Sequence, residues 1–488
     1  MASLAVAACA PAAASGAVAW KSQQVFEGAK VPGTLGGTLS DIATGDVTGD
    51  SLTDIIIAEG AAQQVVVVPA VGPGQFGSPV PTPVGPAESP RRVTSGDLNS
   101  DGRTDVIVEM FSQSSASVIS MLGTPSGAFA SRQTITSGGS FAALLDVNGD
   151  THLDIAVGTS QIELGTGKGD GSFDFPAALR FPYRNLGQTQ VAVGNLDGGL
   201  EDLAVWSLDR AAPHPGSVLT LLTNNGGGYT KSEHTSPFLA GGITMVDLNG
   251  DGFDELLRAE QGLTQSGSLL PPPAGEIDGF TFSPATGLAP GGTVLADGNV
   301  TDLARGDFDL PPDGREDAIA ITNGVRDSFP TGGRQPSLVN WIHNTSAGPV
   351  VRPVTAEGPS GNAIAAGELN GDGVLDFVVS RGSGNGGTVL AYTSFDDVVP
   401  PETQFESAST TTSRADRTPR RAVKIRFKSN EPGSAFKCRI DGGKSQPCRS
   451  PLRPRDLSRG DHVIAVRARD LAGNSERKPA RRKFHVGR

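Results

Sequence analysis

The chain has 488 residues, of which 65 are Gly and 35 are Pro, whereas only 19% are charged and 5% are aromatic. This richness in Gly and Pro favours many short strands and turns over helices. The sequence contains three cysteines and no run of 18 apolar residues, which argues against a disulfide-knotted fold and against a transmembrane span. The net charge is −12, and we expect no nucleic-acid partner.

Residues 1–20 are rich in alanine and end in Ala17-Val18-Ala19. They resemble the end of a secretory signal with a small-x-small cleavage site, although no charged segment comes first. We therefore predict a signal-like leader over residues 1–20 and a secreted, extracellular or cell-surface protein. Residues 6–9 also resemble a bacterial lipobox, and a disordered N-terminus is a further alternative, so soluble and anchored forms both stay open.

An acidic nine-residue motif comes next, and its clearest copy spans residues 97–105. Oxygen-bearing side chains stand at positions 1, 3, 5 and 9, and a glycine suited to a tight turn stands at position 6. Hard cations such as Ca²⁺ take about 6–8 oxygen ligands, and carboxylates this close would repel one another without a cation. The motif predicts a calcium site made by Asp97, Asn99, Asp101 and Asp105.

Related motifs begin at seven positions, spaced by 49 to 61 residues, so the chain repeats a unit of about fifty residues. Several calcium sites are therefore predicted. Ser51 and Thr151 replace the position-6 glycine in the first and third motifs, the fourth motif (Asn195, Asp197, Asp202) is one residue short, and the sixth has two extra residues. The further ligands are Asp46, Thr48, Asp50 and Asp54; Asp146, Asn148, Asp150 and Asp154; Asp247, Asn249, Asp251 and Glu255; Glu368, Asn370, Asp372 and Asp376; and, as a weaker set, Asp307, Asp309, Asp313 and Asp317.

The residues on the C-terminal side of each motif distinguish it from an EF-hand. An EF-hand needs a bidentate Glu at position 12 and flanking helices, whereas position 12 of the second motif is Val108. A short apolar run stands there instead, and such runs are typical of buried strands. In the second repeat we predict strands at residues 106–108, 117–121 and 132–135.

The Gly-Asp-Leu-Asn-x-Asp-Gly-x-x-Asp core that starts at Gly96, together with the glycine-rich turn at residues 164–173, resembles the FG-GAP/VCBS repeat family. These calcium-loop β-propellers include the head of the integrin α-subunit. The resemblance covers roughly residues 22–396 and implies a seven-bladed β-propeller over residues 21–396. It also implies that each calcium loop joins the first two strands of a four-stranded blade.

The two ends of this region predict how the ring closes. Residues 23–28 look like the last strand of a blade, and residues 388–392 look like a third strand without a fourth. The simplest closure pairs these two segments, because a closed ring leaves only short, protected strand edges.

Three repeats carry longer connections between their second and third strands, at about residues 209–216, 262–276 and 326–337. Inserted loops on one face of a repeat scaffold are common binding sites, although they can also be plain solvated surface. The ligand-binding candidates in these connections are Arg210, His214, Arg326, Asp327, Phe329 and Arg334.

The composition changes at a predicted linker, residues 397–402. Residues 401–488 contain 22 Lys and Arg against 9 Asp and Glu, a balance of +13. Residues 421–428 alternate apolar and basic side chains, which predicts a half-buried strand with a basic outer face.

The tail resembles a bacterial immunoglobulin-like module, on the strength of residues 429–433, 438–443 and 468–474. The resemblance implies a small Ig-like β-sandwich over residues 403–488, with Cys438 and Cys448 paired across a hairpin. The predicted fold class is therefore all-β, a propeller followed by a sandwich.

The sequence has no Gly-x-Ser-x-Gly elbow, no His-Glu-x-x-His and no Walker loop. Our preferred hypothesis is a calcium-stabilised, monomeric propeller for binding or adhesion, with an extracellular glycan, an envelope polymer or a protein as ligand. The alternative is an extracellular enzyme, a lyase or hydrolase that acts on polysaccharide. Arg, His and acidic side chains at the propeller axis would favour the enzyme, whereas an empty or apolar axis would favour the binder.

Overall fold

The computed structural model describes residues 18–28, 39–85, 88–112, 116–183, 189–209, 216–236, 239–261, 276–283, 287–295, 299–309, 312–323, 338–345, 348–356, 361–383, 386–396, 401–411, 422–429, 435–454, 457–469 and 475–486. These residues form strands and two short 3-10 helices, η1 (Gly60–Ala62) and η2 (Ala177–Leu179), which confirms the all-β prediction. Within them, no helix has the length and apolar character to cross a membrane. The chain divides into a larger unit, Trp20–Phe308 with Pro312–Ser394, and a smaller unit that contains Phe395–Arg488.

The larger unit begins with three antiparallel sheets, in which the strand order is the chain order. Strand β16 adds to the third sheet by pairing with β14, and β5 (Ala70–Gly72) and β6 (Gln75–Phe76) form a separate two-stranded ribbon. The three sheets contain β2 (Leu39–Gly45), β3 (Asp54–Glu59), β4 (Gln64–Val68) and β7 (Val80–Pro83); β8 (Ser89–Gly96), β9 (Asp105–Phe111), β10 (Ala116–Gly123) and β11 (Phe129–Ser137); β12 (Phe141–Leu145), β13 (Asp154–Gly158), β14 (Gln161–Gly167), β15 (Phe173–Asp174) and β16 (Arg180–Pro182).

Four further sheets complete the larger unit, and the last of them takes its fourth strand from the N-terminal part of the chain. They contain β17 (Thr189–Gly194), β18 (Asp202–Asp209), β19 (Gly216–Asn224) and β20 (Tyr229–Ser236); β21 (Leu239–Val246), β22 (Glu255–Gln261), β23 (Glu276–Ser283) and β24 (Gly287–Leu295); β25 (Asn299–Gly306), β26 (Asp317–Asn323), β27 (Leu338–Thr345) and β28 (Gly348–Ala356); β29 (Gly361–Gly367), β30 (Asp376–Ser383), β31 (Gly386–Asp396) and β1 (Val18–Glu27).

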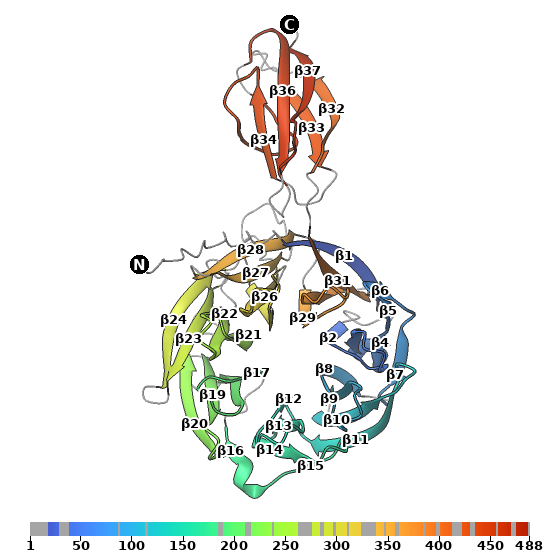
Figure 1. Cartoon of the computed structure of the whole chain (residues 1–488), viewed down its shortest axis with the longest axis vertical. Coiled ribbons are helices and arrows are strands. Elements are labelled where there is room, and N and C mark those ends of the chain that lie inside the picture. The colour runs from blue at the N-terminus through green and yellow to red at the C-terminus, as the bar shows by residue number, and fades with distance from the viewer. Residues whose placement is uncertain are drawn as a thin grey trace, which may run out of the picture. The chain divides into compact units, whose positions relative to one another are not determined.

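The first strands of these sheets surround a common axis (Figure 1). Each packs against the first strand of the next sheet, in the order β2, β8, β12, β17, β21, β25, β29 and back to β2. The side-chain amide of Asn362 in β29 donates to the backbone oxygen of Leu39 in β2 at 3.1 Å, so the ring is closed by contact between distant repeats. The prediction of a β-propeller is confirmed, as is the pairing of the N-terminal strand β1 with β31.

The second strand of each repeat is apolar on both faces because sheets cover it on both sides. In β3, Ile56 packs into the core shared with the following sheet, whereas Ile55 and Ile57 pack into the core shared with the last sheet. All three side chains are fully buried. A strand that lies between two neighbouring sheets therefore reads as a continuous apolar run, not an alternating one.

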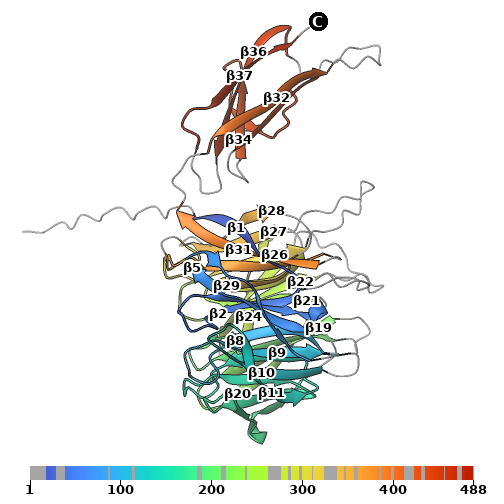
Figure 2. The same cartoon turned by 90° about the vertical axis from the view of Figure 1, so that its right-hand side faces the viewer.

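The smaller unit consists of two sheets that enclose one core (Figure 2). Val423, Ile425 and Phe427 of β33 point into this core, whereas Arg426 and Lys428 are exposed, which confirms the predicted basic outer face. The strands are β32 (Thr403–Thr411) with β33 (Ala422–Ser429), and β35 (Gln446–Cys448), β34 (Ala435–Ile440), β36 (Gly460–Arg469) and β37 (Ala480–Val486).

The predicted disulfide is present and joins β34 to β35. Cys438 and Cys448 lie with their Cα atoms 5.7 Å apart, and the bond closes a loop over a sequence separation of 10. Cys438 is also buried in the core, so the cross-link fixes the edge of the four-stranded sheet to the interior of the unit.

Candidate metal loops and axial pocket

The acidic motifs form the hairpin loops between the first and second strands of the sheets. The residue before the motif pairs with its ninth residue, as Gly45 does with Asp54 and Gly96 with Asp105. The same closing pair recurs between Gly367 and Asp376 in the last sheet. The loop placement implied by the family resemblance is therefore what the chain adopts.

The first positions of each loop face their own backbone. In the second loop, Asp97 accepts hydrogen bonds from the backbone N–H groups of Asp101 at 3.2 Å and Gly102 at 2.8 Å. Asp101 in turn accepts the N–H of Arg103 at 2.9 Å. The oxygens that these side chains offer come from carboxylates and amides, and these are the donors that Ca²⁺ prefers. The donor set therefore fits a hard cation.

Two residues of the second loop adopt left-handed backbone angles, at positions 4 and 6. They are Ser100 and Gly102, with φ of 57° and 81°. Ser51 and Thr151, which replace the position-6 glycine elsewhere, reach φ of 66° and 71°. The turn therefore forms without glycine, although a side chain with a Cβ, and a β-branched one above all, is strained in this region.

Position 9 has a second role that the sequence did not indicate. The fully buried carboxylate of Asp105 accepts the N–H of Leu98 in its own loop at 2.9 Å and the N–H of Gly123 at the end of β10 at 2.7 Å. It thus ties the loop to the third strand of the sheet. The same two kinds of contact are made by Asp154, Asp202, Asp317 and Asp376. Asp54 accepts the N–H of Val47 in its loop and that of Ala70, which lies in β5 just after the third strand.

Burial also changes the acidity of these groups. Desolvation raises the pKa of Asp105 to about 6, and the charges of Asp101 and Asp97 add to the increase. Desolvation raises the pKa of Glu255, the position-9 residue of the fifth loop, to about 7. A cation in the loop would offset this repulsion, because a nearby positive charge favours the ionised carboxyl.

The irregular fourth and sixth loops differ from each other. In the fourth, Asp202 keeps the contact to the third strand through the N–H of Asn224 at 2.6 Å. In the sixth, carboxylate oxygens of Asp307, Asp309 and Asp313 lie within 4.8 Å of one another, in spite of the two extra residues. Position 3 is an Asp here, whereas the other complete loops have Asn or Thr, so three carboxylates can converge.

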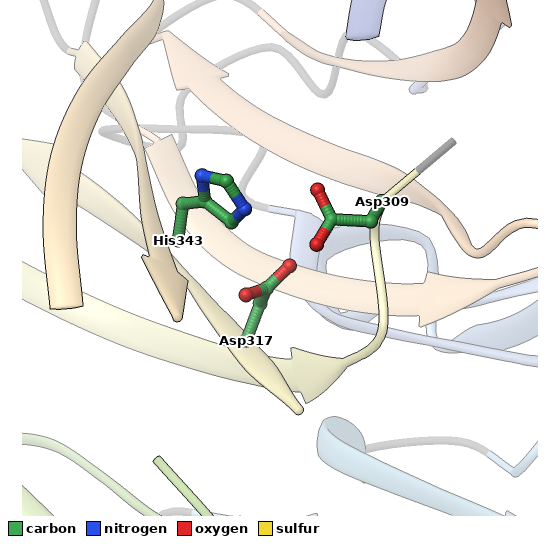
Figure 3. A group of neighbouring side chains, drawn as sticks. All are labelled: Asp309, Asp317 and His343. Atoms are coloured by element: carbon green, nitrogen blue, oxygen red, sulfur yellow. The ribbon is translucent and has the colours of Figure 1, made fainter. Parts of the chain in front are cut away.

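A second group of side chains lies beside the sixth loop. Asp309, Asp317 and His343 are buried and point toward one another, with one ligand atom of each within 4.8 Å of the others (Figure 3). Asp317 already accepts the indole N–H of Trp341 at 2.9 Å and the N–H of Asn344 at 2.6 Å. Nothing in the sequence pattern pointed to His343, which reaches this group because β27 pairs with β26.

The ligand-binding candidates taken from the long connections all fall outside the described residues. These are Arg210, His214, Arg326, Asp327, Phe329 and Arg334. Their assignment stays a prediction.

The larger unit has a pocket of about 410 Å³ on its axis. Six of the seven innermost strands line it, namely β2, β8, β12, β17, β25 and β29. The charged lining residues are Asp41, Arg91, Arg92 and Asp302, and hydroxyl and amide groups such as those of Thr301 and Gln190 lie around them. The axis is therefore polar and charged.

β-Bulges direct these side chains into the pocket. The strand register shifts between Leu39 and Asp41 in β2, and between Pro90 and Arg92 in β8. Equivalent shifts occur between Val300 and Asp302 in β25 and between Gly361 and Ala363 in β29. A bulge inserts an unpaired residue and re-aims its neighbours. The residues inserted by the four bulges, and the residue after each of them, all line the pocket.

Backbone amides hold the two pocket aspartates in place. Asp41 of β2 accepts the N–H of Val93 in β8 at 3.0 Å, and Asp302 of β25 accepts the N–H of Ile364 in β29 at 3.0 Å. Each carboxylate therefore links its strand to the next strand around the ring, and its position is fixed.

The two aspartates are harder to ionise than ordinary carboxyl groups. Burial, followed by repulsion from Asp302, raises the pKa of Asp41 to about 7. Burial raises the pKa of Asp302 to about 6. Arg92 acts against both increases, but one of its guanidinium nitrogens also lies 3.9 Å from a carboxylate oxygen of Glu109. Its charge is therefore shared among three acids.

This pocket was missed in the sequence, although a signal for it exists. Asp41, Arg92 and Asp302 each stand five residues before the first residue of an acidic loop. Aligning the repeats on their loops would have placed these three charged residues in one column of the alignment. The axis carries the Arg and acidic side chains that would favour an enzyme, whereas His does not occur among the described residues that line the pocket.

A comparison with protein families agrees with the repeated loops. Residues 46–108, which span the first two loops, match the FG-GAP-like repeat family. A solved structure described as "Structure of Dos1 propeller" is similar over 73% of this chain and 78% of its own, with 11% sequence identity and a TM-score of 0.38. No curated protein matches the chain significantly in sequence.

Proposed function

We propose that the chain is a secreted or cell-surface binding or adhesion module, a calcium-stabilised seven-bladed propeller joined to an Ig-like unit. Each of the seven sheets would be one blade. The observation that supports this best is the axial pocket, in which polar side chains from six innermost strands converge. Ligand pockets typically combine a preformed cavity with a few fixed polar groups, as this one does.

Calcium would serve the fold and not the ligand. The loops that would hold it are the first, second, third, fifth and seventh, and the sixth is strengthened as a candidate by its three converging carboxylates. A cation bound only by the folded state would stabilise it by mass action.

The pocket suits the exposed end of a glycan or a polar group of a protein. Its volume of about 410 Å³ accommodates a small sugar unit, and carboxylate, amide and hydroxyl groups can exchange hydrogen bonds with sugar hydroxyls. Gln190 and Asn362 contribute two such amides from opposite parts of the ring.

A glycan and peptide array with the calcium-loaded full-length protein tests this function. The Gln190→Ala, Asn362→Ala double variant should lose at least tenfold in signal on the bound spots. The matched control is Gln133→Ala, which removes an exposed amide from the fourth strand β11 and should leave the signal unchanged. Equal binding by both variants would place the ligand site elsewhere on the protein.

A polysaccharide lyase or hydrolase is a second candidate, favoured by the pair Asp41 and Asp302 beside Arg92. A carboxyl with its pKa near 7 can act as a general acid or base at neutral pH. Both carboxylates are held by backbone amides, however, which suits fixed recognition at least as well. A hydrolase would release reducing ends from a polysaccharide, and a lyase would release unsaturated sugars. Either product, if it is absent with the Asp41→Asn variant, would establish an enzyme in place of a binding module.

A further inference from the structure

The axial pocket contains an uneven arrangement of charge. Asp41 and Asp302 project from β2 and β25, on either side of β29, and are close enough for Asp302 to affect the ionisation of Asp41. The cationic groups that line the pocket are Arg92, which also approaches Glu109, and Arg91, which is exposed. Glu109 is buried and accepts the N–H of Ala142 at 2.9 Å, so it stays beside Arg92.

The charges around the pocket therefore leave the two carboxyl groups only partly balanced, because the half-buried guanidinium of Arg92 is shared with Glu109 and Arg91 is exposed to solvent. Both aspartates are positioned by backbone N–H groups of neighbouring strands, so they cannot move apart to reduce their repulsion. A positively charged group between them would gain from both charges in an environment where screening by water is weak.

The remaining lining indicates what else the occupant carries. Ser40, Thr94 and Thr301 offer hydroxyl groups, and Gln190 and Asn362 offer amides. A cavity of about 410 Å³ is much larger than a metal ion needs, and two carboxylates alone supply too few of the about 6–8 oxygen ligands that Ca²⁺ takes. An organic molecule with hydroxyl groups can form hydrogen bonds with the hydroxyl and amide groups of the lining as well as with the carboxylates.

We propose that the axial pocket binds a small organic cation, with an ammonium group between Asp41 and Asp302 and a hydroxyl-bearing skeleton against the amide and hydroxyl groups. This inference rests on the proposed binding function and specifies its ligand class. An amine-bearing sugar unit at the end of a glycan belongs to that class.

The test is calorimetric titration of the calcium-loaded full-length protein with N-methylglucamine and with sorbitol at millimolar concentrations. The first is a polyol with an ammonium group, and the second is its neutral counterpart. N-methylglucamine should bind at least tenfold more tightly than sorbitol.

The variants Asp41→Asn and Asp302→Asn should each reduce this preference at least tenfold, because Asn keeps an acceptor for the backbone N–H but lacks the charge. Glu88→Gln, which removes an outlying carboxylate that pairs with Arg132, should change nothing.

The pH dependence tests the same inference on the unaltered protein. The ionised carboxyls attract the ammonium group, so affinity should rise at least fivefold from pH 5 to pH 8, and binding at pH 6 should release protons to the buffer. Among the groups that face Asp41, Asp302 titrates in the same range, and Arg91, Arg92 and the Glu109 carboxylate beside Arg92 complete the charges around it.

The outcomes separate this inference from the proposed function. Equal affinity for the two polyols, or an affinity that falls as pH rises, would overturn the cation inference and leave a neutral glycan site. If neither polyol binds while the array signal still depends on Gln190 and Asn362, the cation inference fails and the binding function stands. If neither polyol binds and the array is blank, both fail.

Discussion

The two units of the chain are built from short antiparallel strands, yet they stabilise them differently. The smaller unit cross-links two strands with the Cys438–Cys448 disulfide and buries a carboxylate, Glu476, against the backbone N–H groups of Thr403 and Ala468. The larger unit buries an acidic side chain at the end of the acidic loop in every sheet, and in six of the seven sheets this side chain accepts both a loop amide and a strand amide. In the larger unit, repeated hydrogen bonds to buried carboxylates therefore take the role that a disulfide has in the smaller unit. These carboxylates repel the other acidic side chains of their loops, and a bound cation can offset that repulsion.

Removing calcium is the change that separates the two units most strongly. Chelation with EDTA should lower the melting temperature of the larger unit and leave that of the smaller unit unchanged. Each site filled at 100 times its dissociation constant contributes about 2.7 kcal/mol, and several sites act together. Calorimetry combined with hydrogen exchange on the full chain assigns each transition to its unit. If EDTA does not change the melting temperature of the larger unit, calcium does not stabilise that unit.

Breaking one position-9 contact tests the buried-acid device directly. Asp105→Ala leaves the N–H groups of Leu98 and Gly123 buried without their acceptor, and each unsatisfied group costs about 1–3 kcal/mol. The free energy of unfolding of the larger unit should fall accordingly in denaturant titrations. Asp101→Ala, at an exposed position of the same loop, is the control and should cost less in chelated protein. Equal losses would mean that the contact to β10 contributes little.

The disulfide provides the reverse test, in the smaller unit. Replacing both Cys438 and Cys448 by Ser should lower the free energy of unfolding of that unit by about 2–3 kcal/mol, because the short closed loop no longer restricts the unfolded chain. Hydrogen exchange in β34 and β36 measures the loss. Faster exchange in the sheets of the larger unit as well would show that the two units unfold together.

The smallest expected effect concerns the turn at position 6. Thr151 has a φ of 71°, so Thr151→Gly should stabilise the larger unit by about 1 kcal/mol or less through relief of backbone strain. The reciprocal change Gly102→Thr should destabilise it by about 1–2 kcal/mol, since Gly102 has a φ of 81°. Thermal melts of both variants in chelated protein isolate the turn from metal binding. If Thr151→Gly destabilises the larger unit, the threonine side chain stabilises the fold by more than its backbone strain destabilises it.

Features repeated along the chain could be predicted, because each copy supports the others. The period placed the hairpin loops, and the apolar runs after them placed second strands such as β9, whose observed bounds are wider than the predicted residues 106–108. The pairing of β1 with β31 could be predicted because the last repeat had a third strand but lacked a fourth.

Features that arise where repeats meet could not be predicted from any single repeat. Asp41 and Asp302 are 261 positions apart in the sequence, and only ring closure brings their strands to either side of β29. The bulges that aim them inward insert four different residue types, Ser40, Arg91, Thr301 and Asn362, so residue type does not mark them. The buried contact of Asp105 with Gly123 likewise depends on the exact end of β10, which propensity does not define.

The pairing of β1 with β31 also bears on how the protein is made. Hydrogen bonds between the first and last repeats join residues 322 and 323 positions apart, so the native ring forms only after nearly the whole unit has emerged from the ribosome. Until β31 emerges, β1 has no partner strand in its sheet, and an unpaired strand edge can recruit other chains. The sheet that contains β1 and β31 is therefore completed late in synthesis. Aggregation of the nascent chain competes with folding until these two strands pair.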